Sequence, residues 1–136
     1  HTLRLIDSAA GLAVTNPPQG QQMIDIGLTT FAETPEPTRS DCHAWSSSPN
    51  YDLLATVCGV EPASPGFATV RIAPHPGRLK QIKGIVPHSE GDITVELQRD
   101  GNKLSGQVAL PGQLTGDFVW NGKTVKLHPG VNPIRF

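Results

Sequence analysis

The sequence predicts a mainly β protein, an antiparallel β-sandwich or jelly roll preceded by a short N-terminal segment of two or three helices. Its 136 residues fit one domain, and 37% hydrophobic residues together with 14 glycines exclude a disordered chain. Thirteen prolines interrupt long helices, because each lacks a backbone donor and clashes with the preceding turn, so a helical bundle is excluded. The pattern changes near residue 62, from helical spacing to short alternating strands.

Three stretches before residue 62 have helical spacing. One helix is predicted over 2–12, where apolar residues share one face. A second is predicted over 19–32, where the apolar face begins at Met23. The third helix is predicted over 49–58, because Pro49 suits the first helical position and Gly59 suits a left-handed stop. Its apolar face, which we expect in the core, consists of Tyr51, Leu54, Ala55 and Cys58.

Two hairpins are predicted after residue 62. Ile93, Val95 and Leu97 alternate with polar residues before Asp100-Gly101, and a two-residue turn there pairs 97 with 104, 95 with 106 and 93 with 108. Asn121-Gly122 forms the second turn. It pairs Phe118 with Val125 and Gly116 with Leu127. Further strands are predicted over 67–73, 79–86 and 131–136, a spacing typical of a two-sheet sandwich.

Composition excludes several classes of partner. The net charge is −1 and no basic stripe is visible, so we expect no nucleic-acid partner. No apolar run approaches the roughly 18–20 residues that span a bilayer, so we expect no membrane partner. The five histidines and two cysteines lack metal-ligand spacing, so we expect no metal and no other cofactor.

Cys42 and Cys58 are expected to be free thiols. If the 16 positions between them are mostly helical, the two residues lie roughly 24 Å apart, beyond disulfide reach. Free thiols leave a bacterial cytoplasm and periplasm both open. The chain opens at His1 and its one methionine is Met23, so we expect a piece of a longer protein.

A cluster of ionisable and aromatic residues lies in the turn-rich connection before the third helix. Its members are Glu33, Glu36, Asp41, His43 and Trp45. A carboxylate at a helix end is usually a solvated surface group, but functional groups also concentrate on loops held by rigid elements. A tryptophan beside such a cluster suits a sugar, because it supplies an apolar platform next to hydrogen-bonding groups.

The segments 27–33 (GLTTFAE) and 39–46 (RSDCHAWS) resemble the end of the catalytic region of bacterial α-L-rhamnosidases. Short motifs within 53–74, among them Pro65-Gly66-Phe67, resemble the junction into that family's C-terminal β-sandwich. The resemblance covers nearly the whole chain and is strongest from Gly27 to Pro74. It implies that residues 1–61 are the last helices of an incomplete catalytic (α/α)6 barrel and residues 62–136 a C-terminal β-sandwich domain.

The same resemblance implies site residues. Glu33, which closes a T-T-x-x-E run, corresponds to the family's general base in an inverting hydrolysis of terminal α-linked rhamnose. His43 corresponds to a histidine that contacts the sugar hydroxyls, and Trp45 would line the same pocket. The implied partners are a rhamnose-containing glycoside and the rest of the barrel. The family's general acid lies upstream of this segment, so we expect the chain alone to be inactive.

Two other functions stay open from the sequence. One is a non-catalytic carbohydrate-binding or accessory sandwich, in which Trp120 would stack on sugar. Trp120 is also explained by packing against its hairpin neighbour Lys123. The other is a structural interaction domain in which the segment from Glu33 to Trp45 merely packs.

Overall fold

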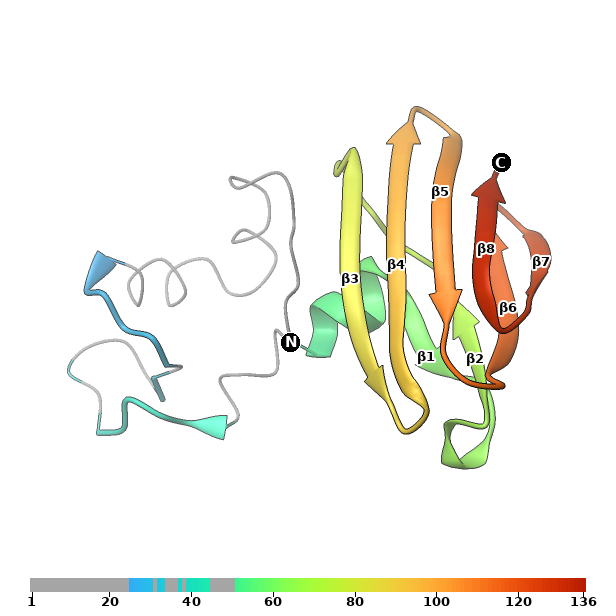
Figure 1. The fold of residues 1–136 in the computed structure, drawn as a ribbon. Helices are drawn as coiled ribbons and strands as arrows, with labels where there is room; N and C mark the ends of the chain where they lie inside the picture. Colours follow the sequence, from blue (N-terminus) through green and yellow to red (C-terminus); the bar gives the residue numbers. More distant parts are fainter. Residues whose placement is uncertain (1–24, 31, 34–36, 38, 45–50) are drawn as a thin grey trace. The chain divides into compact units, whose positions relative to one another are not determined.

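A computed structural model describes residues 25–30, 32–33, 37, 39–44 and 51–136 (Figure 1). The described residues fall into two compact units, one formed by residues 53–136 and the other by the described residues that precede it. The helix predicted over 2–12 and half of the helix predicted over 19–32 lie outside the described residues.

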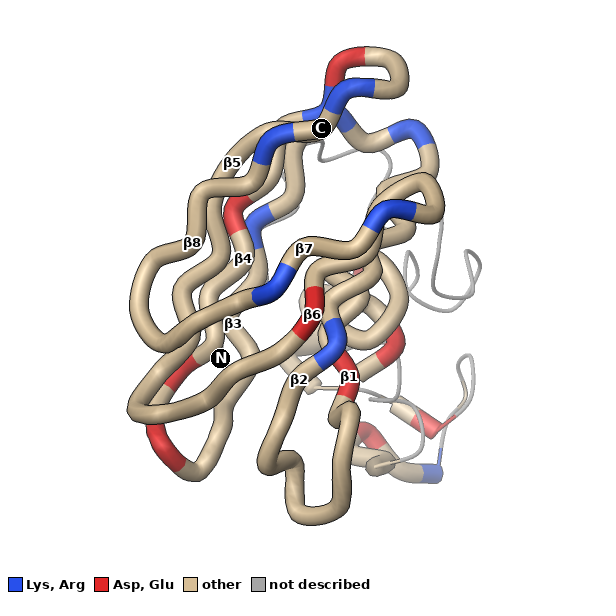
Figure 2. The backbone as a smooth tube through the Cα atoms, turned by 90° about the vertical axis from the view of Figure 1, so that its right-hand side faces the viewer, with Lys and Arg blue, Asp and Glu red and all other residues tan. Residues whose placement is uncertain are grey.

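The unit of residues 53–136 is built from two four-stranded sheets that face one another (Figures 1 and 2). The first sheet has the order β1-β2-β6-β7 and consists of β1 (Val60–Pro62), β2 (Thr69–Ile72), β6 (Thr115–Trp120) and β7 (Lys123–Leu127). The second has the order β3-β4-β5-β8 and consists of β3 (Gln81–His88), β4 (Gly91–Asp100), β5 (Lys103–Leu110) and β8 (Gly130–Arg135). The predicted mainly β sandwich is therefore confirmed.

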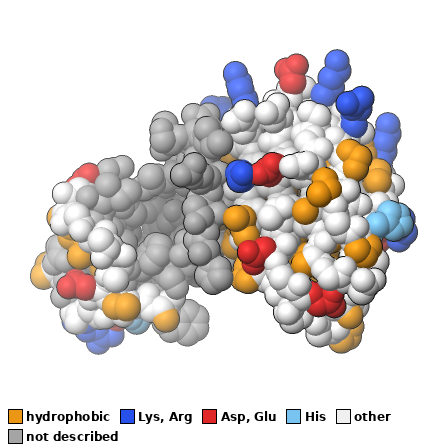
Figure 3. All heavy atoms as spheres, in the orientation of Figure 1, with side chains coloured by type: hydrophobic (Ala, Val, Ile, Leu, Met, Phe, Trp, Pro, Cys, Tyr) orange, Lys and Arg blue, Asp and Glu red, His pale blue; other side chains and the backbone are white. Residues whose placement is uncertain are grey.

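Alternating side chains from both sheets fill the core between them. Ile93, Val95 and Leu97 on β4 are all buried, while the residues between them face outward. The ring of Phe118 on β6 stacks on that of Phe136, which follows β8, with centroids 5.7 Å apart. This contact joins the two sheets. Because side chains alternate between the two faces along each strand, each sheet has one apolar face. Figure 3 shows the outer face of the second sheet.

The hairpin β6–β7 has the predicted register, with Phe118 opposite Val125 and Gly116 opposite Leu127. Its turn residues Asn121 and Gly122 have φ of 47° and 75°. Positive φ at both central positions is the geometry that makes Asn-Gly the favoured turn.

The register predicted for the hairpin β4–β5 is wrong by two residues. Leu97 lies opposite Gly106 and Val95 opposite Val108, because the turn is Gly101-Asn102 and not Asp100-Gly101. Gly101 has a φ of 58°, and glycine at the first central position suits a type II′ turn. A shift of two leaves every side chain on its predicted face.

One strand pair is parallel. β2 runs parallel to β6, with Ile72 opposite Phe118, whereas the other strand pairs in both sheets are antiparallel. The chain forms β3, β4 and β5 between these two strands, so the pairing brings together segments far apart in sequence.

The helix predicted over 49–58 is present in its described part, as a helical turn from Tyr51 that continues as the π-helix Leu53–Val57. It ends before Gly59, whose φ is 70°. The expectation that Tyr51 lies in the core is wrong, because its side chain is 69% exposed. The amide of Cys58 bonds to the carbonyl of Leu53, five residues back, and this wider turn takes Tyr51 off the face of the buried Cys58.

Among the described residues of the predicted 19–32 helix, the helix does not continue beyond Asp25. Gly27 has a φ of 73°, a left-handed conformation that ends a helix. The prediction is therefore wrong for the described residues from Ile26 onward. No helix in the described part of the chain is long and apolar enough to cross a membrane.

Candidate functional site

Hydrogen bonds tie the segment around Glu33 to the segment that begins at Arg39. The amide of Glu33 donates to the carbonyl of Ser40 over 2.9 Å, and the hydroxyl of Thr30 donates to the carbonyl of Asp41. These bonds bring together the two segments that carry the predicted site residues.

The Glu33 carboxylate is held by an arginine. Arg39 donates from Nε to Oε2 over 2.6 Å, and its Nη2 donates to Oε1. The Glu33 side chain is only 14% exposed, whereas that of Arg39 is 85% exposed. The hydrogen bonds from Arg39 are the main reason that the pKa of Glu33 lies below its ordinary value. Desolvation opposes this shift, and the charges of Arg39 and His43 add to it.

Two of the three predicted site residues therefore lie in one neighbourhood. His43 is partly buried, follows Asp41 in the segment that is bonded to Thr30 and Glu33, and contributes to the lowered pKa of Glu33 through its charge. Trp45 lies outside the described residues, as does Glu36. Asp41 is exposed, and its backbone carbonyl takes part in the cluster through Thr30.

Sequence reasoning assigned no role to Arg39. The residue lies within the RSDCHAWS run, but it is six positions from Glu33, a separation that matches neither helical nor strand neighbours. A bidentate arginine keeps Glu33 ionised, and at the same time it lowers the affinity of the carboxylate for a proton. Each carboxylate oxygen accepts one bond from Arg39 and keeps a second lone pair that can accept a hydrogen bond from a water.

The two thiols are free, as predicted. Cys42 is exposed, whereas Cys58 is buried. Burial raises the pKa of the Cys58 thiol to about 12, which leaves it protonated and unreactive near neutral pH. No three histidine, cysteine or carboxylate side chains gather into a metal-ligand set among the residues that the structure describes.

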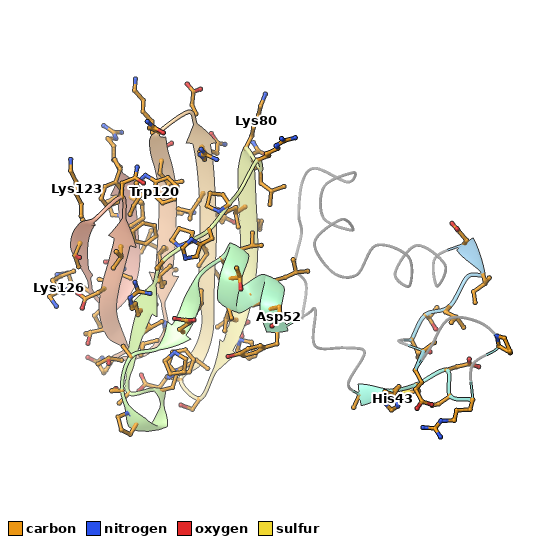
Figure 4. All side chains as sticks on the ribbon, turned by 180° about the vertical axis from the view of Figure 1, so that it is seen from behind. His43, Asp52, Lys80, Trp120, Lys123 and Lys126 are labelled. Atoms are coloured by element: carbon orange, nitrogen blue, oxygen red, sulfur yellow. The ribbon has the colours of Figure 1, made fainter. Side chains whose placement is uncertain are left out.

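Trp120 lies at the end of β6, where its backbone pairs with that of Lys123 (Figure 4). Its indole Nε1 donates to the carbonyl of Asn102 in the β4–β5 turn over 3.3 Å. Trp120 is thus partly buried and links the ends of the two sheets, which agrees with the packing interpretation of this residue.

These features define a class of protein, namely a two-sheet β-sandwich module preceded by a segment in which an arginine binds a carboxylate. A family model described as the bacterial alpha-L-rhamnosidase C-terminal domain matches residues 59–133, more than half of the chain. The chain therefore belongs to this family, and the resemblance seen in the sequence is confirmed. No curated protein matches the chain by sequence.

Solved structures of α-L-rhamnosidases are similar to the chain. An α-L-rhamnosidase from Aspergillus terreus superimposes with a TM-score of 0.75 at 20% identity, covering 89% of this chain and 16% of its own. One from Dictyoglumus thermophilum gives 0.67 at 19% identity, with coverages of 86% and 17%. A GH78 family rhamnosidase from Bacillus sp. GL1 is 36% identical over 60% of this chain and 9% of its own, with a TM-score of 0.56. The chain thus spans about a sixth of the first two proteins.

Proposed function

We propose that this chain is the C-terminal part of a glycoside hydrolase that acts on terminal α-L-rhamnosides. The match of residues 59–133 to the C-terminal domain of bacterial alpha-L-rhamnosidases is the observation that carries this proposal. Support also comes from the similar structures, which are several times longer than this chain.

In this proposal, the residues that precede the sandwich complete the catalytic barrel, and the sandwich, which begins at β1 (Val60–Pro62), supports it. The sandwich closes a core of its own, since Phe118, Ile93 and Leu104 are fully buried among its strands. Its contribution to the enzyme is then structural. It covers apolar helix surface of the barrel that water would otherwise contact.

Glu33 serves as the general base of an inverting reaction. Its carboxylate, kept ionised by Arg39, removes a proton from the water that attacks the anomeric carbon. The general acid that protonates the leaving oxygen stands about 6.5–9.5 Å away and comes from the rest of the enzyme. His43 contacts the hydroxyls of the sugar, and Trp45 forms a wall of the pocket.

The chain alone is then inactive, because it offers a base without the acid and without the remaining barrel walls. Proximity and proton transfer each account for orders of magnitude in rate, and both are lost.

The test is Glu33→Gln in the longer enzyme, assayed with an aryl α-L-rhamnoside. We expect kcat to fall by about 10²–10⁴-fold, the usual range for a general base, with rhamnose binding retained. The matched control is Glu61→Gln, which removes an exposed carboxylate on β1 that pairs with Arg71. Unchanged turnover in Glu33→Gln would reject the base assignment, and rhamnoside hydrolysis by the 136-residue chain would reject its inactivity.

The alternative is a non-catalytic carbohydrate-binding or accessory sandwich. It would gain support if Glu33→Gln kept full turnover while an oligosaccharide shifted the fluorescence of Trp120, which lies on the sandwich and not in the Glu33 segment.

A further inference from the structure

Six cations gather at one end of the sandwich, which we call the basic end. They are Arg78, Lys80, Arg99, Lys103, Lys123 and Arg135. Figure 2 shows lysines and arginines concentrated along this edge, and Figure 4 shows Lys80 and Lys123 there. Asp100 lies among these cations and lines the same hollows as Lys80 and Arg99.

The strand pairings explain why these residues meet. The amide of Arg99 donates to the carbonyl of Lys80 over 2.7 Å, and Asp100 lies opposite Lys103 across the β4–β5 turn. Arg135 at the end of β8 lies opposite Ser105. The bond from Trp120 to the same turn brings the β6–β7 hairpin, with Lys123, to this end.

The cations of the basic end have no carboxylate partner within ion-pair distance in the part of the chain that the structure describes. Its ion pairs lie elsewhere: Arg39–Glu33, Arg71–Glu61, Lys83–Glu96 and Lys126–Asp117. Arg99 is oriented by its own bonds, which Nε makes to the carbonyl of Gly101 over 2.8 Å and Nη1 makes to that of Gly77. The cations of the basic end outnumber Asp100 beside them, and this excess of positive charge attracts an anion to the surface.

A groove connects the basic end to the outer face of the second sheet. A hollow of 410 Å³ is lined by the cations Lys80, Arg99, Lys103 and Arg135, by Asp100 and Phe136, and by the polar residues Gln81, Gln98 and Ser105. These last three also line a hollow of 580 Å³ that continues along the sheet to Gln107. The register accounts for the continuity, because Gln81, Gln98, Ser105 and Arg135 form one row across the four strands. Figure 3 shows this face, with cations at its upper edge.

The lining of the groove matches the chemistry of an acidic sugar. Glutamine amides and a serine hydroxyl donate and accept hydrogen bonds, as sugar hydroxyls require, and the cations pair with carboxylates. Protein interfaces, in contrast, have aromatic-rich centres depleted of charge. Glu96 adds no free negative charge to the wall, because Lys83 and Gln107 hold its two oxygens.

We propose that this groove binds an acidic oligosaccharide, with uronate carboxylates at the basic end and sugar hydroxyls along the row of Gln81, Gln98 and Ser105. The inference rests on the proposed function, because an enzyme that acts on rhamnosides works on glycans. Beyond the proposed function, it assigns a binding site to the sandwich, which is the unit without Glu33. It also names the class of ligand for that site.

The test is isothermal titration of the 136-residue chain with three probes of similar length: hexagalacturonate, neutral maltohexaose and hexaglutamate. We expect hexagalacturonate to bind at least tenfold more tightly than either of the others, with an affinity that falls as salt screens the charges. Equal binding of hexaglutamate would show general attraction of polyanions and overturn the proposal. Absence of hexagalacturonate binding, or equal binding of maltohexaose, would overturn it as well.

Two double variants locate the site. Lys103→Gln/Arg135→Gln should weaken hexagalacturonate binding about fivefold or more, since one exposed ion pair accounts for a factor of about two to five. The matched control, Arg71→Gln/Lys126→Gln, removes the same charges from exposed positions on the other sheet and should change the affinity by less than about twofold. An equal loss in both variants would overturn the proposal.

Chemical-shift perturbation by hexagalacturonate should be confined to residues 80–81, 98–105 and 135, and perturbation elsewhere would overturn the site. None of these measurements depends on hydrolysis. If hexagalacturonate does not bind but Glu33→Gln loses turnover, the groove proposal alone is rejected. If hexagalacturonate binds but Glu33→Gln keeps turnover, the catalytic proposal alone is rejected.

Discussion

Arg39 and Glu33 form a bidentate pair in which an exposed arginine donates two hydrogen bonds to a carboxylate that is mostly shielded from solvent. The pair is local to its segment, because a backbone hydrogen bond from Glu33 to Ser40 brings the two residues together. Arg39 therefore lowers the pKa of Glu33, and this effect can be measured in the chain as it stands.

Arg39→Ala should raise the pKa of Glu33 towards its ordinary value of 4.5, because the largest cause of its lowering is lost. A lowered pKa stabilises the folded segment above the ordinary value, and this contribution is lost as pH falls through the folded pKa. In the variant, the free energy of unfolding should therefore no longer show the decrease that Glu33 contributes as pH falls from 4.5 through the folded pKa. Carbon-13 NMR titration of the Glu33 carboxyl measures the shift.

Glu96 is the internal control for this titration. Its pKa is lowered chiefly by the hydrogen bond from Lys83, far from Arg39 in the sequence, and should stay unchanged in Arg39→Ala. An unchanged Glu33 in the variant, or equal shifts of both carboxyls, would show that Arg39 does not hold this charge.

One of the two thiols should react with Ellman's reagent in the folded chain, and both should react in denaturant. Cys42 is exposed, whereas Cys58 is fully buried with a pKa of about 12. Cys42→Ser should abolish labelling of the folded chain and Cys58→Ser should leave it unchanged. Two fast-reacting thiols in the folded chain would contradict the burial of Cys58.

The free energy of unfolding should also fall in alkali, because burial raises the pKa of the Cys58 thiol. An unfolded cysteine ionises near pH 9.0, but the folded Cys58 stays protonated up to about pH 12. Its contribution is fully present below the first value and is lost progressively between the two. Urea unfolding at pH 8 and pH 10 in the chain and in Cys58→Ala separates this effect from other titrations, since the variant should show the smaller loss.

Gly59→Ala should destabilise the sandwich strongly. Gly59 has a φ of 70°, and an added Cβ would lie 2.1 Å from the backbone carbonyl of Ala73. Left-handed strain and a forced backbone shift together should lower the free energy of unfolding by about 2–5 kcal/mol. Gly101→Ala is the matched control, because its φ of 58° meets open space, and it should cost about 1 kcal/mol. Equal losses in denaturant unfolding would show that the contact with Ala73 is unimportant.

Phe118→Ala should lower the free energy of unfolding by about 3–5 kcal/mol, the usual cost of emptying a buried phenylalanine site. Phe118 is fully buried and stacks on Phe136 from the opposite sheet. Val125→Ala, on the same hairpin but 43% exposed, should stay within about 0.5 kcal/mol. If both variants unfolded at the same urea concentration, the two sheets would not share a core at this point.

Comparison of the hairpins shows how far sequence reasoning reaches. The Asn121-Gly122 turn was predicted with its register, because both residues favour the positive φ that the turn needs. At Asp100-Gly101-Asn102 two adjacent turns satisfy the same alternation, so the faces were predicted correctly and the register was not. The helix from Tyr51 was predicted from its caps, but its π geometry, and so the exposure of Tyr51, was not.

The sequence by itself determined the mainly β class, the faces of the strands, the Asn121-Gly122 hairpin and the family resemblance, because these depend on residues a few positions apart. Only the tertiary structure decided the parallel pairing of β2 with β6, the grip of Arg39 on Glu33 and the gathering of Lys80, Arg99 and Arg135 at one end. The strand pairing and the gathering of cations need whole elements to pack against one another, and the Arg39–Glu33 pair needs a turn whose six-residue separation follows no helical or strand period.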